Sequence, residues 1–558
     1  MGSQEHLDIF SPKALRLAWE RYIRTGQRES KDYFGIRAFG SNLDVNLQTL
    51  SVSLQKGEFR PTRPPKFYRP KSSGMQRTIT ILPVADALVY QAVANDVAVR
   101  TYARMDENKD FVFGTVLNEE VPLGLKLLDK PDAEFFFFKP YLSLYKAFAD
   151  SVNEAIRVDK VTHKFETDIT GFFDAIPHYN LLAFLGDECG LHEEILDLLG
   201  DCLNVWSGTR EGPTPGVGIP QATSASHFFA NLFLNDLDNL IKDRGLRYYR
   251  YMDDIRIYGY SHDDLQRVMV ELDRYLKRHA LSLNAKKTGI EKLTIENEAD
   301  SFIAFDYGKE QAEASAQTDT SVEFASLAEQ DGAIHDDKEV GNSSLRKKTI
   351  AACRSQLLDV ARVMREKLSP EGRKTLSIHD RSVQREFMGM GFRFRQAHRI
   401  LKELGVPVKL GGESEIAGWL FLLDQYYWLA DQFCWSLALY ENNKTVKTRL
   451  LELAEKYQCY EWVGHHLYQC LALSQEFSTK ELRDMFRALD GHKDWYTKRT
   501  VYLLLLRHSR DSQFLKSIVA HAANESDPVL KREVLSCVEL WGKKGLSREQ
   551  LMDALGVR

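Results

Sequence analysis

The most constraining feature of the sequence is a pair of adjacent aspartates between two short runs of apolar and aromatic residues, LRYYRY and IRIYGY. Both runs alternate as half-buried strands do, so residues 246–260 are predicted to form a β-hairpin with Asp253 and Asp254 at its tip. Neighbouring carboxylates at a tight turn repel each other unless a cation lies beside them. The hairpin therefore predicts a site for a divalent cation with oxygen ligands.

A third carboxylate lies upstream, at the end of another strand-like stretch. The segment HKFETDITGFFDAI places Asp168 after alternating residues and before two phenylalanines. Two strand ends that present Asp168 and Asp253 together can hold two Mg²⁺ ions about 4 Å apart, which activate a 3′-hydroxyl and stabilise a leaving pyrophosphate. The tetrapeptide YMDD alone is a weak signal, and an ordinary turn is the alternative reading of it.

Further motifs stand in order around these aspartates, and together they resemble the fingers and palm of reverse transcriptases. That family includes bacterial enzymes related to group II introns, retrons and abortive-infection systems. The resemblance covers residues ~45–308 and implies an α+β fold of fingers and palm. From the helical pattern downstream, we expect an all-α helical repeat domain to follow it. The motifs are YRPKSSGMQRTITILPVADALVYQAV, GVGIPQATSASHFFANLFLNDL, LSLNAKKTGI and SFIAFDYG, the last matching a primer grip at Phe302 to Phe305.

The resemblance also implies roles for individual residues. Asp168, Asp253 and Asp254 match the catalytic metal ligands, which implies Mg²⁺ as cofactor, with Mn²⁺ as the alternative metal. Phe173 matches the bulky side chain that collides with a ribose 2′-hydroxyl, and Lys287 matches a proton donor near the pyrophosphate. For Lys287 a solvated loop lysine is the alternative. The implied dNTP-binding residues are Lys71, Arg77, Phe173, Gln221 and Lys287. Pro83, Asp86 and Gln91 match the framework of the fingers segment, and Asn284 and Thr288 match the LNxxKT element that contains Lys287.

Three departures from the family pattern concern loops near the expected site. The usual GIPQG is GIPQA here, with Ala222 in the last position, and the Ser-Pro that opens the next helix is Ser226-His227. Residues 111–152 replace a short glycine-arginine segment with an aromatic one, which resembles the corresponding region of defence-associated reverse transcriptases. A buried aromatic core explains these aromatic residues equally well.

Charge and composition divide the chain into segments. Residues 309–345 hold 9 acidic and 2 basic residues with no sustained period, which predicts an acidic flexible insertion or linker. Residues 346–400 hold 14 basic and 5 acidic residues on an amphipathic helical pattern, which indicates either a phosphate-binding surface or a solvated face. The predicted domains are 1–308 (fingers and palm), 309–345 (linker), 346–435 (basic helical thumb-like segment) and 436–558 (HEAT-like α-repeat).

The last predicted domain depends on a period of 33 residues. Glu461-Trp462, Asp494-Trp495 and Asp527-Pro528 begin helical stretches at this spacing, and Leu482 and Leu515 hold equivalent places in the helices between them. Helix pairs at this period resemble an α-solenoid of the HEAT type, and a plain helical bundle is the alternative.

Composition excludes several classes of protein. No run of about 18 apolar residues is present, so we expect no membrane association. The first residues lack the charge and hydropathy of a secretory signal, and the seven cysteines form no CxxC pair. These features predict a soluble protein of the cytoplasm.

The predicted function is Mg²⁺-dependent DNA synthesis by a reverse-transcriptase-type nucleotidyltransferase. A polymerase followed by an α-repeat resembles the abortive-infection enzymes, which implies bacterial anti-phage defence, with protein-primed or untemplated synthesis. One alternative is RNA-templated cDNA synthesis on a dedicated non-coding RNA, as in retrons. Another is a nucleic-acid-binding scaffold with a vestigial polymerase. The expected partners are dNTPs, the DNA product, an RNA template or scaffold, and a homo-oligomer or an operon-encoded protein.

Overall fold

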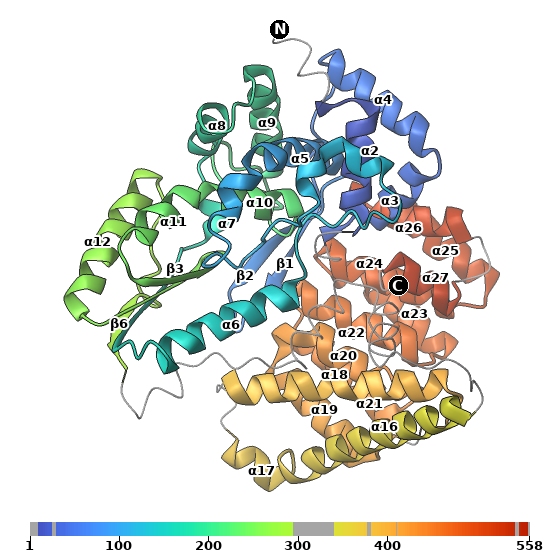
Figure 1. Ribbon diagram of the computed structural model, residues 1–558. Coiled ribbons are helices and arrows are strands. Elements are labelled where there is room, and N and C mark those ends of the chain that lie inside the picture. The colour runs from blue at the N-terminus through green and yellow to red at the C-terminus, as the bar shows by residue number, and fades with distance from the viewer. Residues whose placement is uncertain are drawn as a thin grey trace. The chain divides into compact units, whose positions relative to one another are not determined.

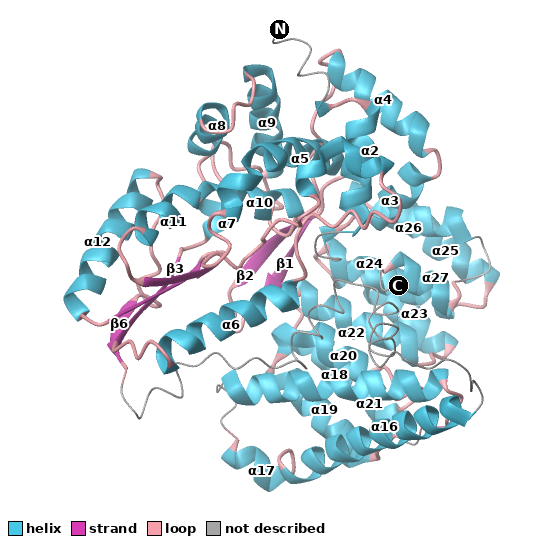
Figure 2. Ribbon diagram, viewed as in Figure 1, coloured by secondary structure: helices cyan, strands magenta, loops and turns pink. Residues whose placement is uncertain are grey.

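The computed structural model describes residues 9–24, 30–293, 340–376, 381–408, 410–541 and 546–555. The chain divides into two compact units. The N-terminal unit comprises Met1–Lys66 and Thr78–Phe305, and the C-terminal unit comprises Phe67–Arg77 and Asp306–Arg558. Helices make up most of both units (Figures 1 and 2). No helix among the described residues combines the length and the apolar character that a membrane span requires.

The N-terminal unit is built on an antiparallel sheet with the strand order β4-β5-β3-β6. Helix α12 packs on β3, β5 and β6, and α6 packs on β4. The inward residues of the central strands, Phe165, Ile255 and Ile257, are fully buried. The strands are β3 (His163–Asp168), β4 (Arg247–Tyr251), β5 (Asp254–Gly259) and β6 (Gly289–Lys292).

Helices surround this sheet and supply most of the core of the N-terminal unit. Helix α5 is buried along most of its length because apolar residues lie on nearly all of its faces. The helices are α2 (Pro12–Arg24), α3 (Tyr33–Gly40), α4 (Leu43–Gln55), α5 (Val84–Asp106), η2 (Val121–Asp129), α6 (Tyr141–Arg157), α7 (Phe172–Ala175), α8 (His178–Asp187), α9 (Glu193–Trp206), α10 (Ser224–Phe233), α11 (Asn235–Lys242) and α12 (His262–Arg278).

The C-terminal unit is a stack of helices joined to one β-hairpin. Helices α16, α18, α20, α22, α24 and α26 pack each on the next, and α19, α21, α23 and α25 each pair with the helix that follows them. Figure 1 shows this stack running from yellow to red along the chain. The helices are α16 (Val340–Glu366), α17 (Pro370–Thr375), α18 (Arg381–Glu403), α19 (Glu413–Gln425), η3 (Tyr427–Leu429), α20 (Ala430–Leu437), α21 (Lys444–Lys456), α22 (Glu461–Ser474), α23 (Thr479–Ala488), η4 (Leu489–Gly491), α24 (Trp495–His508), α25 (Ser512–Ala523), α26 (Pro528–Trp541) and α27 (Arg548–Ala554).

The hairpin consists of β1 (Lys66–Pro70) and β2 (Gln76–Thr80), which form a two-stranded sheet. The chain passes from the N-terminal unit into the C-terminal unit after Lys66 and returns at Thr78. Most of an N-proximal hairpin thus belongs to the C-terminal unit.

The predicted fold class is confirmed, with a mixed sheet-and-helix region followed by helices. Helices α22, α24 and α26 begin at Glu461, Trp495 and Pro528, which matches the predicted period of 33 residues to within one position. Helix α16 begins at Val340, five residues before the predicted end of the acidic linker. Residues 309–339 of that linker, and the predicted primer grip at Phe302 to Phe305, lie outside the described residues.

Candidate active site

The aspartate pair lies at a two-residue hairpin between β4 and β5. Tyr251 pairs with Asp254 across the two strands, so Met252 and Asp253 form the turn. Met252 has φ +56, a left-handed conformation that is uncommon for a residue with a side chain. Gly114 packs so closely on the turn that a Cβ there would lie 2.5 Å from the Met252 nitrogen. A glycine is therefore required at 114 for the turn to adopt this position.

The third carboxylate faces this hairpin from the neighbouring strand. Asp168, the last residue of β3, is the direct partner of Asp254, the first residue of β5. The Oδ1 atom of Asp168 is buried and accepts no hydrogen bond from the residues that the structure describes. A buried carboxylate oxygen without a partner is costly, and a bound cation would satisfy it. The antiparallel register thus brings Asp168 beside Asp254, and Asp253 precedes Asp254 in the turn.

An arginine partly balances this negative charge. Arg256 lies 3.4 Å from Asp254 and 3.1 Å from Glu166, with its guanidinium above the Phe148 ring. Burial raises the pKa of the Asp254 carboxyl, and the nearby Arg256 opposes that rise, while the charges of Glu166 and Asp168 add to it. The raised pKa of Asp254 therefore reflects its burial first, and the neighbouring carboxylates second.

The loop before β6 closes the end of β3. The backbone N–H of Asn284 donates to the Asp168 carbonyl (2.8 Å), and the hydroxyls of Thr167 and Thr288 lie 2.7 Å apart. These bonds bring the Lys287 ammonium onto Oδ2 of Asp168 as an ion pair. The predicted pyrophosphate-side lysine, Lys287, therefore lies at the Asp168 carboxylate.

A buried ion pair supports the aspartate turn from below. Arg250 of β4 binds Asp238 of α11 through two nitrogens, at 2.6 and 2.7 Å, and Nη1 donates to the Met252 carbonyl (2.9 Å). Burial would lower the pKa of the Arg250 guanidinium, but the charge and hydrogen bonds of Asp238 raise it above the ordinary value. Arg250 therefore stays charged and fixes the carbonyl that precedes Asp253.

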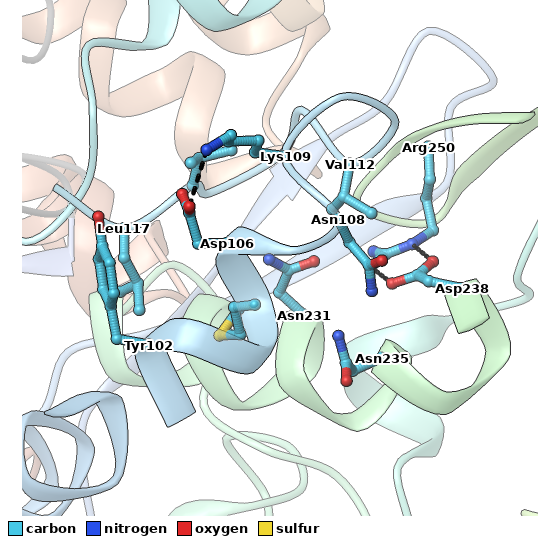
Figure 3. A pocket seen from close by; sticks show the side chains of 12 residues that line it. Tyr102, Asp106, Asn108, Lys109, Val112, Leu117, Asn231, Asn235, Asp238 and Arg250 are labelled. Carbon is cyan, nitrogen blue, oxygen red and sulfur yellow. Dashed lines mark hydrogen bonds and ion pairs between the residues drawn. The ribbon is translucent and has the colours of Figure 1, made fainter. Parts of the chain in front are cut away.

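The same pair lines a small pocket between α5, α10 and α11 (Figure 3). Two asparagines there, Asn108 and Asn231, carry buried side-chain oxygens that have no hydrogen-bond partner among the described residues. Polar, incompletely paired linings of this kind typically hold ordered water. We assign this pocket a structural role beneath the hairpin.

Phe173, the predicted 2′-hydroxyl filter, lies on the short helix α7 that follows β3. Its side chain is 9% exposed and meets the His227 ring edge-on, with centroids 5.2 Å apart. The backbone N–H of Ile219 donates to the Phe173 carbonyl (2.8 Å), which joins α7 to the GIPQ loop. His227, one of the departures from the family pattern, thus braces the ring of Phe173.

The GIPQ loop itself carries a strained residue. Ala222 has φ +76, in the region that glycine adopts without cost, and its carbonyl accepts a hydrogen bond from Ser30 (3.0 Å). This explains why glycine is usual at that position in the family pattern. The neighbouring Gln221 has a buried side-chain Oε1 without a partner in the described part of the chain. Gln221 therefore keeps an acceptor available for a ligand.

The framework residues hold α5 in place. The Asp86 carboxylate accepts from the Thr62 N–H (2.7 Å) and from the Trp206 indole (2.8 Å), and burial raises its pKa to about 6. Gln91 donates to Asn95 (2.9 Å). These contacts are structural, as the resemblance implied.

The aromatic segment before β3 packs against the hairpin. Tyr141, Tyr145 and Phe148 of α6 surround the Tyr251 ring, with centroids 5.7 to 5.9 Å away. The two readings of this segment, a family feature and a buried aromatic core, are compatible with these contacts.

The two remaining predicted site residues, Lys71 and Arg77, are exposed on the β1-β2 hairpin, which groups with the C-terminal unit. The six other predicted site residues belong to the N-terminal unit. Within that unit, the sheet and its loops bring Lys287 to Asp168, and β3 leads through Gly171 into α7 and Phe173.

Sequence reasoning missed the supporting charges Arg250, Asp238 and Arg256. A signal for Arg250 was present, because it shares a strand face with the buried Tyr248 and a charge on a buried face requires a partner. The identity of that partner, Asp238, follows only from the packing of α11.

One comparison with known proteins, the match to a family model, agrees with this geometry. Residues 70–321 match the family model described as reverse transcriptase (RNA-dependent DNA polymerase). No curated protein matches the sequence. A solved structure of telomerase from Candida albicans with a fragment of telomeric RNA matches with 11% identity and a TM-score of 0.29, over 88% of this chain and 70% of that one. A TM-score this low establishes no shared fold. Residues 70–321 thus form a reverse-transcriptase domain, and a domain of this family indicates RNA-directed DNA polymerase activity.

Proposed function

We propose that the chain synthesises DNA with Mg²⁺, or Mn²⁺, held by Asp168, Asp253 and Asp254. The unpaired, buried Oδ1 of Asp168 opposite Asp254 carries this proposal. All three side chains offer hard oxygen ligands, which suit these ions. When bound, such ions activate the primer hydroxyl and stabilise the leaving pyrophosphate.

The surrounding residues would bind and select the nucleotide. Lys71 and Arg77 supply positive charge for a triphosphate, and Gln221 offers its free acceptor to the base or the template strand. Phe173, braced by His227, excludes a ribose 2′-hydroxyl and so favours dNTPs over NTPs. Once the Lys287 ammonium has released Asp168, it would donate a proton to the departing pyrophosphate.

The helical part would bind nucleic acid and mediate assembly. Its two rows of paired helices and their period support a HEAT-like α-repeat over 436–558. Most of helix α16 lies in the thumb-like segment 346–435, and its exposed basic side chains would hold a primer or product strand. The acidic segment 309–345 would link this segment to the fingers and palm. Replacing Arg354, Arg362 and Arg365 by glutamine should weaken DNA binding and reduce its salt dependence; an unchanged salt slope would exclude this surface.

The biological setting that we propose is anti-phage defence in the bacterial cytoplasm, by protein-primed or untemplated synthesis. A polymerase domain followed by paired helices supports it, because abortive-infection reverse transcriptases resemble this arrangement. A homo-oligomer or an operon-encoded protein would complete the assembly.

The mode of synthesis is testable with purified full-length protein. We would measure incorporation of each labelled dNTP with Mg²⁺, with and without nuclease pretreatment, and then separate the product by protease digestion and phenol partition. Asp253→Asn/Asp254→Asn is the inactive variant, and Asp263→Asn, an exposed carboxylate on α12, is its matched control.

Nuclease-resistant activity that yields protein-linked DNA would support self-primed synthesis. Activity lost with the RNA would favour a templated enzyme that uses a dedicated RNA, as retrons do. No incorporation by the wild type on any template would contradict the polymerase and favour the scaffold hypothesis.

A further inference from the structure

The β1-β2 hairpin is held by the first turns of successive helices in the C-terminal stack. The Phe67 side chain is fully buried and stacks on Tyr496 of α24, with parallel rings 4.2 Å apart. On the same side it lies parallel to Trp462 of α22, at 5.8 Å. Such stacked pairs add to the free energy of burial. Phe67 is therefore the apolar anchor of the hairpin.

Polar contacts fix the orientation of β1 around this anchor. The backbone N–H of Tyr68 donates to the Glu461 carboxylate (2.6 Å), so this strand is bound through its main chain. The Arg69 guanidinium lies 4.8 Å above the Trp462 ring and 3.8 Å from the Asp431 carboxylate of α20. These contacts use both an ionised partner and a ring face, which makes them stronger than neutral hydrogen bonds.

The tip of the hairpin is bound as well. Gly74 has φ +81, and its carbonyl accepts a hydrogen bond from the Tyr460 hydroxyl (3.3 Å). A Cβ at Gly74 would lie 3.4 Å from that hydroxyl and 3.5 Å from the hydroxyl of Tyr427. Burial and the neighbouring Tyr460 raise the pKa of Tyr427 to about 12, so this tyrosine stays neutral. The C-terminal helices thus contact the hairpin both along β1 and at its turn.

The two basic residues remain exposed on the bound hairpin. The Lys71 N–H donates to the Met75 carbonyl (2.7 Å), which closes the turn, and Arg77 lies on the exposed part of β2. The C-terminal helices therefore fix the backbone that carries Lys71 and Arg77 without burying either residue.

We propose that Tyr496, Trp462 and Glu461 are positioning residues for nucleotide binding, acting through the hairpin that carries Lys71 and Arg77. This rests on the proposed triphosphate role of those two bases. The helical unit would then contribute to nucleotide binding through the hairpin segment Phe67–Arg77 that it contains, and would not be only an appended assembly module. Pre-organisation of a binding group acts mainly on affinity, so the dNTP is the ligand whose binding should change.

The test uses the full chain and its incorporation of labelled dTTP as the varied substrate, with and without oligo(dT) on poly(rA). Tyr496→Ala should raise KM for dTTP about tenfold with a smaller change in kcat, and Tyr496→Phe, which keeps the stacked ring, should restore it. Tyr502→Ala is the matched control. Tyr502 is a fully buried tyrosine of the same helix that bonds to His521 and Glu525, so its loss should reduce the amount of folded enzyme without moving KM.

A second variant with a smaller structural change tests the same role if Tyr496→Ala does not fold. Tyr460→Phe removes only the hydroxyl that binds Gly74 and should raise KM about threefold. Its control is Tyr457→Phe, because the Tyr457 hydroxyl donates to Asp424 and not to the hairpin. For variants without turnover, calorimetric titration of dTTP with Mg²⁺ gives the affinity directly.

Lys71→Ala and Arg77→Ala separate the two proposals. If both raise KM while Tyr496→Ala and Tyr460→Phe behave like their controls, the positioning role is overturned and the triphosphate role stands. If neither Lys71→Ala nor Arg77→Ala moves KM, the triphosphate role fails, and the positioning role fails with it.

Discussion

The two units differ in the distance along the chain over which their contacts reach. In the N-terminal unit, the Lys287–Asp168 pair joins residues 119 positions apart. In the C-terminal stack, contacts such as His465–Thr500 and Arg499–Glu533 join residues 35 and 34 positions apart, which is one repeat. Stability in such a stack is a sum over neighbouring repeats, whereas a sheet with distant partners forms as one cooperative body. A destabilising substitution should therefore raise local unfolding throughout the N-terminal unit, but only in neighbouring helices of the C-terminal stack.

The largest expected effect comes from breaking the buried ion pair under the active-site turn. Asp238→Ala leaves Arg250 charged and unpaired, and should destabilise the N-terminal unit by about 3–5 kcal/mol. Hydrogen exchange followed by mass spectrometry should show faster exchange throughout β3, β4 and β5. The counterpart Glu533→Ala should accelerate exchange only in α24 and α26. Faster exchange limited to α11 in Asp238→Ala would contradict the contrast between the units.

A change in substrate selection should be confined to the N-terminal unit. Phe173→Ala removes the bulk beside the ribose and should raise the efficiency of rNTP relative to dNTP incorporation about a hundredfold. Phe173→Tyr keeps the bulk and should leave discrimination intact. Ratios of kcat/KM for rUTP and dTTP measure the effect, and equal discrimination by wild type and Phe173→Ala would remove Phe173 from this role.

Acid should affect the units in opposite directions. Burial lowers the pKa of His466 to about 4, so the stability it contributes is complete above pH 6.5 and is lost as pH falls toward 4. At pH 5 the free energy of unfolding should be lower by about 2 kcal/mol than at neutral pH because of His466. The pKa of Asp86 is raised to about 6, so its site is more stable at pH 4 and loses stability as pH rises to 6.

Hydrogen exchange at pH 7 and pH 5, corrected for the intrinsic rate, distinguishes these two responses. Peptides from α22 should open more readily at pH 5, and peptides around Asp86 should not. His466→Gln should reduce the acid sensitivity of α22 without affecting α5, and the sensitivity that remains should come from His465, whose pKa burial also lowers. An identical pH response in the wild type and His466→Gln would assign the sensitivity to other groups.

The smallest expected effect is at the strained loop residue. Ala222→Gly relieves a left-handed backbone at φ +76 but makes the unfolded chain more flexible, so the net stabilisation should be about 0.5–1 kcal/mol. Denaturant unfolding measures it, and Ala225→Gly on α10 should destabilise instead. A loss of stability in Ala222→Gly would show that the loop carries no such strain.

Local patterns in the sequence were enough to predict the active-site hairpin. Alternation placed Asp253 and Asp254 at a turn, and the order of motifs placed Asp168 on a second strand, because strands and turns depend on neighbouring residues. The period of 33 residues in the C-terminal unit was visible for the same reason. The Asp238–Arg250 pair was not predictable, since it depends on how α11 packs.

The packing of the β1-β2 hairpin on α22 and α24 was also not predictable from the sequence. Tyr68 and Glu461 are 393 positions apart, and aromatic residues such as Phe67 and Tyr496 fit an ordinary core equally well. Only the packed structure shows that Lys71 and Arg77 share a unit with α22 and α24.

The most direct test of the central claim is incorporation of labelled dTTP by the wild type and by Asp168→Asn across a titration of Mg²⁺, with and without oligo(dT) on poly(rA). Wild-type activity should require the ion, and Asp168→Asn should lose about a thousandfold in rate with unchanged melting and unchanged binding of the primed template. Wild-type extension that persists in EDTA, or full activity of Asp168→Asn, would contradict the assignment of these carboxylates.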